Sequence, residues 1–531
     1  MSSTRLPASR LWDRVYAAQV DRLSIDKHGI PGHELMERAG SSAARHIRSL
    51  APAGARFLIL AGPGNNGGDA LVVARLLTQL RLPVDVVLVH PDPQKITPDC
   101  RRQLEALNRL SVHPQSWTPG CLPSGGEEEA LVVVDGILGI GLKGDLRPGP
   151  FLDCLRETAG LKTAMVIAID VPSGADANRW DQQLPLTADV SITFGGPKPV
   201  HAVSPGRTQC GQILTEDIGF AAPAITEASR TCPPLLLRVD EEALLAGSPW
   251  DDLPADIHKY DRGHVLVIGG SAGKCGAPLM TAMAALRSGA GWATVALPPD
   301  LEKPELPVEL TYEDLFTRAK PDPAAIGEFI RNRRVRSLVI GPGTTTSLLD
   351  AALMKELCRL MADTGLFVVI DAGCLQGLPD LLKKSAATPG RLLLTPHPGE
   401  WRTMVGKAAP APTNQELVAT IQKTWQPSGA TILYKSATPL LLAPGATPVV
   451  LNGGSNALAK AGTGDVLCGA VAAHGALGSD ATYAGARGLA LLNRAAAICA
   501  EDFGPHGLLP TDLITGLAKA SSPAPTSRKP K

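Results

Sequence analysis

Short runs of β-branched and aliphatic residues alternate with longer stretches rich in alanine and leucine along most of the chain. The short runs have the length of buried strands, and the longer stretches have the length of helices. Strands that alternate with helices favour parallel sheets that are covered by helices on both faces. The pattern therefore predicts an α/β fold, with strands at 57–61, 84–89, 131–134, 166–169, 191–194, 265–268, 338–340, 367–370, 392–394 and 432–434.

The length of 531 residues is too great for one ordinary domain, so two or more domains are expected. The segment 221–256 is rich in proline and alanine and shows little periodicity before a new start at His258. We therefore predict a first domain over 1–228 and a second over 229–520. The terminal segment 521–531 is rich in serine, proline and basic residues, which predicts a disordered tail.

The composition argues against several broad classes of protein. Lys plus Arg and Asp plus Glu both number 51, and this balance is not that of a general nucleic-acid binder. No apolar run has the length of a membrane span, and residues 1–30 lack the apolar core of a secretory signal. The 10 cysteines include no C-x-x-C pair, so neither a zinc knuckle nor a redox dithiol is indicated. We expect a cytoplasmic homo-oligomer with small-molecule substrates and no nucleic-acid or membrane partner.

Polar residues and glycines follow most of the predicted strands at the point where each strand ends. In open parallel sheets, ligands bind beyond the carboxyl ends of the strands. Each half of the chain therefore gathers its polar groups along an edge where a site is expected, which predicts two separate sites. The groups are Gly62, Asn65, Asn66, Asp69, Asp135 and Asp170 in the first half, and Gly269, Gly270, Ser271, Gly341, Gly343, Asp371, Thr395, His397 and Lys435 in the second.

The densest of these motifs is the run 452–465, in which two glycines flank Thr463 and an apolar stretch at 466–473 predicts a helix. Such a turn aims backbone N–H groups and the positive end of a helix at one point, where an anion such as a phosphate can bind. Asp465 lies at the mouth of this predicted anion hole. A base that deprotonates a hydroxyl for phosphoryl transfer would be placed there. The alternative role of Asp465 is a simple N-cap of its helix.

Two other residues of the second half support a site for phosphorylated ligands. Lys435 ends a strand and could neutralise a nucleotide phosphate as a point charge, although solvated lysines at strand ends are common. His397 lies between two prolines in a rigid turn, which favours a substrate contact over a place in the core. With Asp465, these residues predict a small-molecule phosphoryl-transfer site without a Walker A motif.

The stretch from Gly62 to Gly67 matches the spacing G-x-G-x-x-G between a strand and a helix, as in dinucleotide-binding loops. Two asparagines in the loop and Asp69 at the start of the helix place polar groups and a negative charge where pyrophosphate normally rests. We therefore do not interpret this loop as that of a dehydrogenase.

Asp135 and Asp170 are better candidates for chemistry in the first half. Oxygens of Asn66, Asp135 and Ser173 could hold a hard monovalent or divalent cation. Asp170 ends a buried strand and is followed by a turn. The alternative is that both aspartates only cap the turns or helices that follow them. The loop 139–145 could cradle a phosphate or form a bare turn.

The motifs of the two halves resemble two known enzyme domains. GNNGGD at 64–69, DGILG at 135–139, DVPSG at 170–174 and MERAG at 36–40 resemble the NAD(P)H-hydrate epimerase domain. KY at 259–260, GGS at 269–271, TPHPGE at 395–400 and the run 452–465 resemble the ADP-dependent NAD(P)H-hydrate dehydratase. In this order they resemble the family of bifunctional bacterial NAD(P)H-hydrate repair enzymes over nearly the whole chain. The resemblance implies a Rossmann-like three-layer α/β/α domain followed by a ribokinase-like α/β domain.

This resemblance also implies an activity, that of a bifunctional isomerase and lyase. The epimerase would interconvert the R and S forms of NADH and NADPH hydrated at the nicotinamide ring, NADHX and NADPHX. The dehydratase would remove water from the S hydrate with ADP and release AMP and phosphate. Because hydroxide is a poor leaving group, phosphorylation of the hydroxyl gives the ring nitrogen a better group to expel. Potassium (K+) would bind in the epimerase domain, and Mg2+ would accompany the nucleotide.

The site residues that the resemblance implies can be named in both halves. Asp170 would transfer protons in the epimerase, and Asn66, Asp135 and Ser173 would bind potassium. The first hydrate site would be formed by Asn65, Asn66, Gly67, Gly68, Asp69, Gly139, Ile140, Gly141, Leu142, Lys143, Gly144, Asp145 and Asp170. Asp465 would be the base of the dehydratase and would contact the hydrate together with Ala277, Gly343 and His397. The adenine nucleotide would be held by Lys435, Ser436, Ala437, Thr438, Pro439 and Gly464.

Two positions depart from the pattern of this family, which has a second acid at the place of Gly373 and a glycine at the place of Ser436. A rival hypothesis is a small-molecule hydroxyl kinase fused to a non-catalytic Rossmann-like binding domain, whose product would keep the phosphate. The sequence leaves open the choice between ADP and ATP and between the two hydrated dinucleotides. It also leaves open whether an intermediate passes directly between the two sites.

Overall fold

The computed structural model describes residues 6–90, 95–123, 130–247, 250, 253–254, 256–302, 305–406 and 411–521. The chain forms two compact units. One comprises Arg10–Leu236 with Thr413–Gln415, and the other comprises Met1–Ser9, Leu237–Pro412 and Glu416–Lys531. The expected boundary between residues 228 and 229 falls within helix α8 (Ala222–Thr231), which packs in the first unit. The predicted tail lies, beyond Ser521, outside the described residues.

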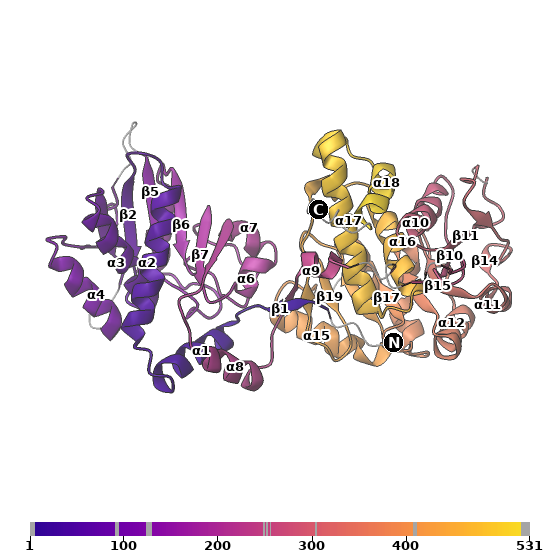
Figure 1. Cartoon of the computed structure of the whole chain (residues 1–531), viewed down its shortest axis with the longest axis horizontal. Coiled ribbons are helices and arrows are strands. Elements are labelled where there is room, and N and C mark those ends of the chain that lie inside the picture. The colour runs from indigo at the N-terminus through magenta and orange to yellow at the C-terminus, as the bar shows by residue number, and fades with distance from the viewer. Residues whose placement is uncertain are drawn as a thin grey trace, which may run out of the picture. The chain divides into compact units, whose positions relative to one another are not determined.

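The first unit contains a seven-stranded sheet in which every strand pair is parallel (Figure 1). The order is β4-β3-β2-β5-β6-β7-β8. All five strands predicted for this half are present. The bounds are β2 (Arg56–Ala61), β3 (Val84–Leu88), β4 (Gln115–Ser116), β5 (Leu131–Gly136), β6 (Met165–Ile169), β7 (Val190–Phe194) and β8 (Gln212–Glu216).

Helices cover both faces of this sheet because the strands are apolar on both faces. Alternate strand residues such as Ile59 and Val134 pack in one core with α2 and α3, and the intervening residues such as Leu58 and Val133 pack in another with α5. The predicted three layers, α/β/α, are thus present. The helices are α1 (Arg14–Asp26), α2 (Gly32–Leu50), α3 (Asn65–Gln79), α4 (Pro98–Asn108), α5 (Pro150–Ala159), α6 (Pro199–Ala202), α7 (Gly206–Cys210) and α8.

The second unit is built on an eleven-stranded sheet with the order β1-β9-β20-β19-β18-β17-β16-β15-β10-β11-β12. The strands from β12 to β18 are parallel, whereas β18, β19 and β20 pair antiparallel. All five predicted strands are again present. The bounds are β1 (Ala8–Arg10), β9 (Leu237–Val239), β10 (His264–Ile268), β11 (Trp292–Ala296), β12 (Thr311–Tyr312), β15 (Val335–Ile340), β16 (Phe367–Ile370), β17 (Leu392–Leu394), β18 (Thr431–Tyr434), β19 (Leu440–Leu442) and β20 (Val449–Val450), with a separate ribbon of β13 (Phe316–Thr317) and β14 (Lys320–Pro321).

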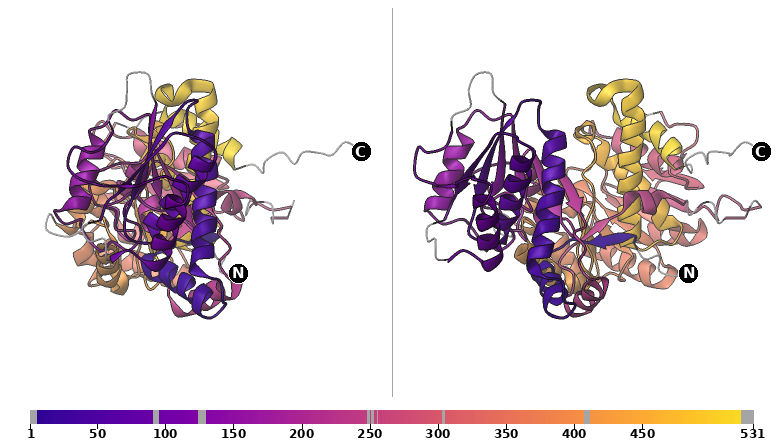
Figure 2. Two further views of the ribbon diagram at one scale, coloured as in Figure 1. Left: turned by 90° about the vertical axis from the view of Figure 1, so that its left-hand side faces the viewer. Right: turned by 60° about the vertical axis from the view of Figure 1, so that its left-hand side comes forward.

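Helices α10, α16, α17 and α18 pack together against this sheet (Figures 1 and 2). Their contact is close because small residues lie between them. A Cβ atom at Gly469 of α16 would lie 2.1 Å from the Thr281 carbonyl oxygen of α10. The helices of this unit are α9 (Glu241–Leu245), α10 (Gly276–Arg287), α11 (Pro323–Asn332), α12 (Ala351–Thr364), α13 (Leu378–Leu382), α14 (Pro398–Val405), α15 (Gln415–Trp425), α16 (Thr463–Ala476), α17 (Ala481–Gly507) and α18 (Pro510–Ala520), with 3-10 turns η2 (Ala372–Leu375), η3 (Gln426–Ser428) and η4 (Asn456–Leu458).

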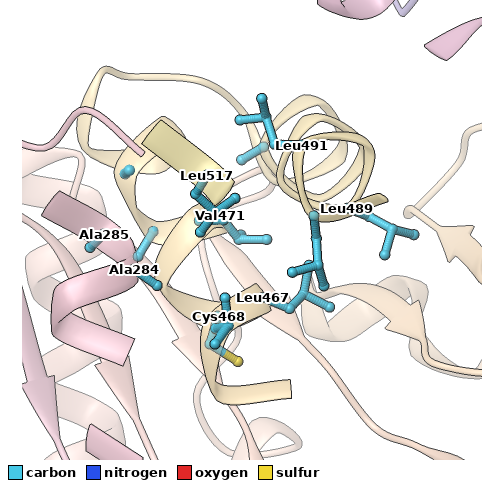
Figure 3. Close-up of a cluster of buried hydrophobic side chains, with 14 of the residues drawn as sticks. Ala284, Ala285, Leu467, Cys468, Val471, Leu489, Leu491 and Leu517 are labelled. Carbon is cyan, nitrogen blue, oxygen red and sulfur yellow. The ribbon is translucent and has the colours of Figure 1, made fainter. Parts of the chain in front are cut away.

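Helix α16 is apolar around most of its circumference, which is typical of a helix buried on all sides. Leu467, Cys468 and Val471 of this helix meet Leu489 of α17 and Leu517 of α18 in one cluster (Figure 3). The start of α16, which carries Asp465, therefore stands on a well-packed support. No helix of the described chain is both long and apolar enough to cross a lipid bilayer.

Each sheet has one point where the order of the strands reverses. In the first unit, β3 and β4 lie on one side of β2, and β5 lies on the other. In the second unit, β11 and β12 lie on one side of β10, and β15 lies on the other. Ligands of open α/β sheets bind at such switch points, beyond the carboxyl ends of the strands. Ligand sites are therefore expected at the loops after β2 and β5 in the first unit and at the loops after β10 and β15 in the second.

Candidate active sites

A cavity of about 610 Å³ lies at the switch point of the first unit. The loops after β2 and β5 meet there because glycines allow close contact. A Cβ atom at Gly62 would lie 1.8 Å from the Ile137 carbonyl oxygen, and one at Gly67 would lie 1.8 Å from the Gly62 carbonyl oxygen. Gly62 and Gly67 of the G-x-G-x-x-G match are thus required by packing within the fold, whereas no atom lies within 4 Å of a Cβ position at Gly64. The interpretation that this loop is not that of a dehydrogenase stays a prediction.

Asp170, directly after β6, is held by a buried lysine in the wall of this cavity. Its Oδ1 accepts hydrogen bonds from the Thr193 hydroxyl at 2.8 Å and from Lys198 Nζ. Lys198 Nζ also donates to Thr193 Oγ1 at 2.7 Å and to the Phe194 carbonyl oxygen at 3.0 Å. Three acceptors use all three N–H groups of the ammonium, and Lys198 is only 2% exposed. Asp170 Oδ2 makes no hydrogen bond with the described residues, so this oxygen has free lone pairs.

The backbone of Asp170 has φ +65°, in the left-handed region that non-glycine residues rarely adopt. Such conformations cost about 1–3 kcal/mol and persist where the surroundings enforce them. Here the surroundings are the two hydrogen bonds to Oδ1. The strain indicates that the position of this carboxylate matters to the molecule.

The charges around Asp170 favour its ionised form. Burial alone would raise the pKa of Asp170, but the Lys198 ammonium and the Thr193 hydroxyl outweigh burial and lower the pKa below its usual range. His201, whose Nδ1 accepts a hydrogen bond from the Lys198 backbone at 3.1 Å, is neutral because burial and the nearby Lys198 lower its pKa to about 3. Asp170 is therefore a carboxylate at neutral pH.

The pKa of Asp69, on the first turn of α3, is shifted in the direction opposite to that of Asp170. Burial raises its pKa well above the usual range, and the nearby charges of Asp170 and Asp21 raise it further. Asp21 and Asp99 line the same cavity, and burial and Asp99 raise the pKa of Asp21. Pairs of carboxyl groups with pKa values driven apart are typical of acid–base sites. The sequence did not single out Lys198, Thr193, Asp21 or Asp99, because only the fold brings them to this cavity.

Asp135 and Ser173 form a second buried cluster beside the cavity. Ser173 Oγ donates to Asp135 Oδ1 at 2.5 Å, and Ser173 N donates to Asp135 Oδ2 at 2.7 Å. Burial raises the pKa of Asp135, and these hydrogen bonds partly offset that rise. A Cβ atom at Gly139 would lie 3.2 Å from Asn66 Oδ1, so the Asn66 side chain lies against the same 135–139 loop. Asn66 Nδ2 is buried and has no hydrogen-bond partner among the residues that the structure describes.

The structure therefore brings many of the expected residues of the first site together. Asn65, Asn66, Asp69, Gly139, Ile140, Gly141, Leu142 and Asp170 line the cavity. Gly67 and Gly68 instead pack inside the fold, since a Cβ atom at Gly68 would lie 2.4 Å from Met36 Cε. Asp145 is paired with Arg179 and Gln182 at 3.2 and 2.9 Å. Lys143, Gly144 and Asp145 are not in the cavity wall.

A second cavity of about 860 Å³ lies beyond the strand ends of the second unit. The loops after β10 and β15 meet as the corresponding loops of the first unit do. Gly270 N donates to the Pro342 carbonyl oxygen at 2.8 Å, and a Cβ atom at Gly269 would lie 2.3 Å from that oxygen. Gly343 has φ +72° and lines the cavity, and a Cβ atom there would lie 3.0 Å from Ala277 Cβ. Ala277 thus supports the cavity wall through Gly343.

The start of α16 forms one side of this cavity. The N-cap of the helix is Gly462, with φ +94° and no side-chain cap. The alternative that Asp465 caps the helix is therefore wrong, because Asp465 lies within the first turn. A Cβ atom at Gly464 would lie 3.3 Å from Lys435 Nζ, so an ammonium group meets the helix start. Free backbone N–H groups, the helix dipole and this ammonium together favour a bound anion.

Asp465 has a pKa near neutrality. Burial, together with the negative charges of Asp371 and Glu400, outweighs the opposing charge of Lys435 and raises the pKa of Asp465 to about 7. General bases work best when their pKa is close to the operating pH. The carboxyl group therefore changes protonation state in the range where a base that accepts and releases a proton is needed.

Lys435 is shared by two carboxylates. Its Nζ lies 2.8 Å from Asp371 Oδ1 and 3.7 Å from Glu400 Oε2. Burial would lower the pKa of Lys435, but these carboxylates raise it above its ordinary value. His397 caps α14: its Nδ1 accepts from Gly399 N at 2.9 Å, and its backbone N–H donates to Glu400 Oε2 at 2.9 Å. The His397 side chain is 54% exposed at the cavity, as expected for a ligand contact rather than a core residue.

Five of the residues expected to hold the nucleotide, 435–439, connect β18 to β19, and the sixth, Gly464, lies in the first turn of α16. Lys435, Ser436, Pro439 and Gly464 line the cavity, whereas Ala437 and Thr438 do not. Ser436 Oγ donates to the Thr438 carbonyl oxygen at 2.7 Å, which fixes the turn. The Ala437 carbonyl contacts the loop after β20, since a Cβ atom at Gly453 would lie 1.6 Å from that oxygen.

Gly373 departs from the family pattern for a packing reason. A Cβ atom there would lie 2.8 Å from both Thr344 Oγ1 and Thr346 N. The loop after β15 therefore occupies the space that a side chain would need. Asp371, predicted as a strand-end polar group of this site, lines the cavity, and so do Lys274, Thr344, Glu400 and Lys460, to which the sequence had assigned no role.

Comparisons with known proteins agree with this division into two sites. The family described as "YjeF-related protein N-terminus" matches residues 32–200, and the family described as "NAD(P)H-hydrate dehydratase" matches residues 265–519. A bifunctional NAD(P)H-hydrate repair enzyme of Salinibacter ruber is 30% identical over 525 residues, which cover 94% of each chain. The enzyme of the same name from Moorella thermoacetica is 31% identical over 526 residues, which cover 93% of each chain.

Among solved structures, an ADP/ATP-dependent NAD(P)H-hydrate dehydratase of Bacillus subtilis is 23% identical, covers 53% of this chain and 95% of its own, and has a TM-score of 0.40. The two curated relatives, in contrast, extend over both units and both cavities. The two family matches also follow one another in the order that the motifs indicated. The chain therefore belongs to the family of bifunctional NAD(P)H-hydrate repair enzymes.

Proposed function

We propose that this chain repairs hydrated NADH and NADPH in two steps at its two cavities. The first unit interconverts the R and S hydrates, and the second unit converts the S hydrate to NAD(P)H with ADP, releasing AMP and phosphate. The observation that carries the proposal is the contrast between two carboxyl groups at strand-end cavities. The pKa of Asp170 is lowered by a lysine, whereas that of Asp465 is raised to about 7 beside an anion hole.

In the epimerase step, Asp170 Oδ2 accepts a proton from the hydrate and returns it. Lys198 and Thr193 hold the other carboxylate oxygen, so Oδ2 is the oxygen available to the substrate. Asn65, Asn66, Asp69 and the loop 139–142 would surround the hydrated ring. Gly67, Gly68 and the segment 143–145 would act through the conformation of those loops.

Potassium would be held by oxygens of Asn66, Asp135 and Ser173. Two features fit this assignment: the oxygen ligands are those that hard cations prefer, and Asp135 is 1% exposed, so its buried charge favours a bound cation. When bound, the ion would neutralise the buried carboxylate and join the loops after β5 and β6. No group of three or more His, Cys, Asp or Glu residues in the described chain could hold a metal ion instead.

In the dehydratase step, ADP would lie along 435–439 and Gly464, with the hydrate against Ala277, Gly343 and His397. Asp465 takes the proton of the hydrate hydroxyl, whose oxygen attacks the β-phosphorus of ADP and displaces AMP. The N–H groups at the start of α16 and the Lys435 ammonium stabilise the transferring phosphoryl group.

The second half of this step removes the new phosphate ester. The bond between the ring carbon and the ester oxygen breaks as the ring nitrogen donates its electron pair, and phosphate leaves. Loss of a proton from the ring then gives NAD(P)H. Mg2+ would arrive with the nucleotide, whose charge it neutralises. This fits a cavity that carries the carboxyl groups of Asp371, Glu400 and Asp465 around one buried lysine.

The experiment that tests both activities follows dihydronicotinamide absorbance in a mixture of R and S NADH hydrates. Parallel reactions contain ADP, ATP or no nucleotide, and a second set contains NADPH hydrates. Full recovery with ADP is expected, and recovery that stops at the S fraction would contradict the epimerase assignment. A product that keeps its phosphate would favour a hydroxyl kinase, the rival hypothesis.

The cytoplasmic location and the homo-oligomeric state stay predictions. All ten cysteines are free, which supports a reducing compartment. Light scattering of the purified full chain would test the oligomeric state, and fractionation of the native cells would test the location.

A further inference from the structure

Asp371, directly after β16, is a buried and hydrogen-bonded charged group of the second cavity. The proposed reaction gives it no step. It is 3% exposed, and its Oδ1 accepts hydrogen bonds from two groups. These are Lys435 Nζ at 2.8 Å and the hydroxyl of Thr395 at 2.7 Å, and Thr395 is fully buried. A buried carboxylate with two fixed donors has one orientation, so Asp371 fixes the position of Lys435.

Contacts extend from this pair to the residues assigned to substrate and nucleotide. Glu400 Oε2 lies 3.7 Å from Lys435 Nζ and accepts from the His397 backbone N–H at 2.9 Å. The ends of β16, β17 and β18 are thereby joined side by side through Asp371, Thr395 and Lys435. In this way the ammonium is held where the start of α16 meets it.

The charges around Asp465 come from several elements. Asp371 and Lys435 face it from the strand ends, Glu400 faces it from the first turn of α14, and Cys468 lies one turn along α16. His397, Lys274 and Lys460 line the same cavity. Asp371 is the largest charged contribution after burial to the raised pKa of Asp465, although no hydrogen bond joins the two carboxyl groups. Its influence on Asp465 is therefore through charge.

We propose that Asp371 is a positioning residue of the dehydratase step, which holds Lys435 at the start of α16 and keeps a negative charge beside the base Asp465. The proposal rests on the proposed function of this cavity. Without Asp371, the ammonium of Lys435 can turn to Asp465 and pair with it. Asp465 would then be stabilised as a carboxylate and become a weaker base, and the phosphate-binding ammonium would be misplaced.

The test uses Asp371→Asn in the full chain, which keeps the shape of the side chain and removes its charge. We expect kcat of the ADP-dependent dehydration to fall about tenfold to a hundredfold, the scale of losing a charge-assisted hydrogen bond. The acidic limb of kcat/KM against pH should move to lower pH, because Asp465 loses a neighbouring negative charge. Epimerisation by the same preparation should be unchanged, because Asp170 belongs to the other unit, and thermal unfolding shows whether the second unit of the variant is folded.

Two matched variants separate charge from packing. Thr395→Val removes the other hydrogen bond to Asp371 but no charge, so the limb should stay in place. Glu400→Gln removes the more distant carboxylate, so the limb should move in the same direction by less. An Asp371→Asn enzyme with the wild-type limb and kcat would overturn the proposal.

If Asp371→Asn does not fold, the test is the acidic limb of kcat/KM against pH for Glu400→Gln. A limb at the wild-type pH would overturn the proposal. Failure of the proposed function has a different signature. In that case the wild-type chain itself would show no ADP-dependent recovery of absorbance.

Discussion

Both units place a buried lysine and an aspartate together at strand ends, but the lysine contacts a different kind of aspartate in each. In the first unit, Lys198 pairs with Asp170, the residue proposed to move protons, and the pKa of Asp170 is lowered. In the second unit, Lys435 pairs with Asp371, and the proposed base Asp465 has a pKa of about 7. Burial raises the pKa of both carboxyl groups, and the comparison teaches that a lysine paired directly with the carboxylate can outweigh burial, whereas a lysine paired with another aspartate does not.

The sharpest separation of the two sites is expected from Asp465→Asn. General-base catalysis contributes about 10²–10⁴ in rate, so ADP-dependent dehydration should fall by that factor. Epimerisation should continue, because Asp170 belongs to the other unit. Chiral analysis of the hydrates and absorbance at the dihydronicotinamide band measure the two reactions in one preparation. Retained dehydration would remove Asp465 from the mechanism.

Lys198→Met breaks the pair in the first unit. Asp170 then keeps only the Thr193 hydrogen bond, and burial together with Asp69 should raise its pKa. We expect epimerisation at neutral pH to fall about a hundredfold, with its acidic limb moved to higher pH, since unpaired buried charges cost about 3–5 kcal/mol. This direction is opposite to that expected for Asp371→Asn. Thr193→Val, which removes only a hydroxyl, should move the limb less.

The loop contacts at the two switch points can be compared by glycine substitution. Gly62→Ala and Gly269→Ala each place a Cβ atom against a backbone carbonyl, at 1.8 and 2.3 Å. Each should destabilise its own unit by about 3 kcal/mol and impair one activity, since overpacking of this kind costs about 1–3 kcal/mol or more. Gly64→Ala is the control, because no atom lies within 4 Å of its Cβ position. Thermal unfolding and both activities give the readout.

The smallest effect should be a change of stability with pH at Asp465. The pKa of Asp465 in the folded state, about 7, exceeds its ordinary value of 3.8. The contribution of Asp465 to the free energy of unfolding is therefore largest below pH 3.8. This stability is lost as the pH rises through about 7, because ionisation is disfavoured in the folded state. Asp465→Asn avoids the loss and should raise the free energy of unfolding at pH 8 by about 1–3 kcal/mol, with little effect at pH 4. Urea unfolding at both values checks the sign.

The strands were predictable because periodicity and β-branched composition are local. The ten predicted strands are all present, but ten others were missed, most of them only two or three residues long: β1, β4, β8, β9, β11, β12, β13, β14, β19 and β20. Two of the five residues of β11, WATVA, are alanines, and β19 is a short LLL segment that pairs antiparallel. Glycine spacing also indicated where the chain approaches itself closely.

The candidate sites were predictable only in part. Motifs located Asp170 and Asp465, whereas Lys198 joins Asp170 across 28 residues and Asp371 joins Lys435 across 64. Such pairs depend on the order of strands in the sheet, which local pattern does not contain. Gly373 looked like a lost acid, but the fold shows a position without room for any side chain.

The strand β1 has a consequence for the engineering of this chain. It precedes the first unit in sequence but is an edge strand of the second unit's sheet, next to β9, where Asp240 N donates to the Pro7 carbonyl oxygen at 2.9 Å. A single cut before Leu237 would therefore not yield two whole proteins. The released half would have an open edge at β9, which invites pairing with another chain, and the other half would carry a strand without a sheet. Two separately expressed units would therefore need β1 joined to the second unit.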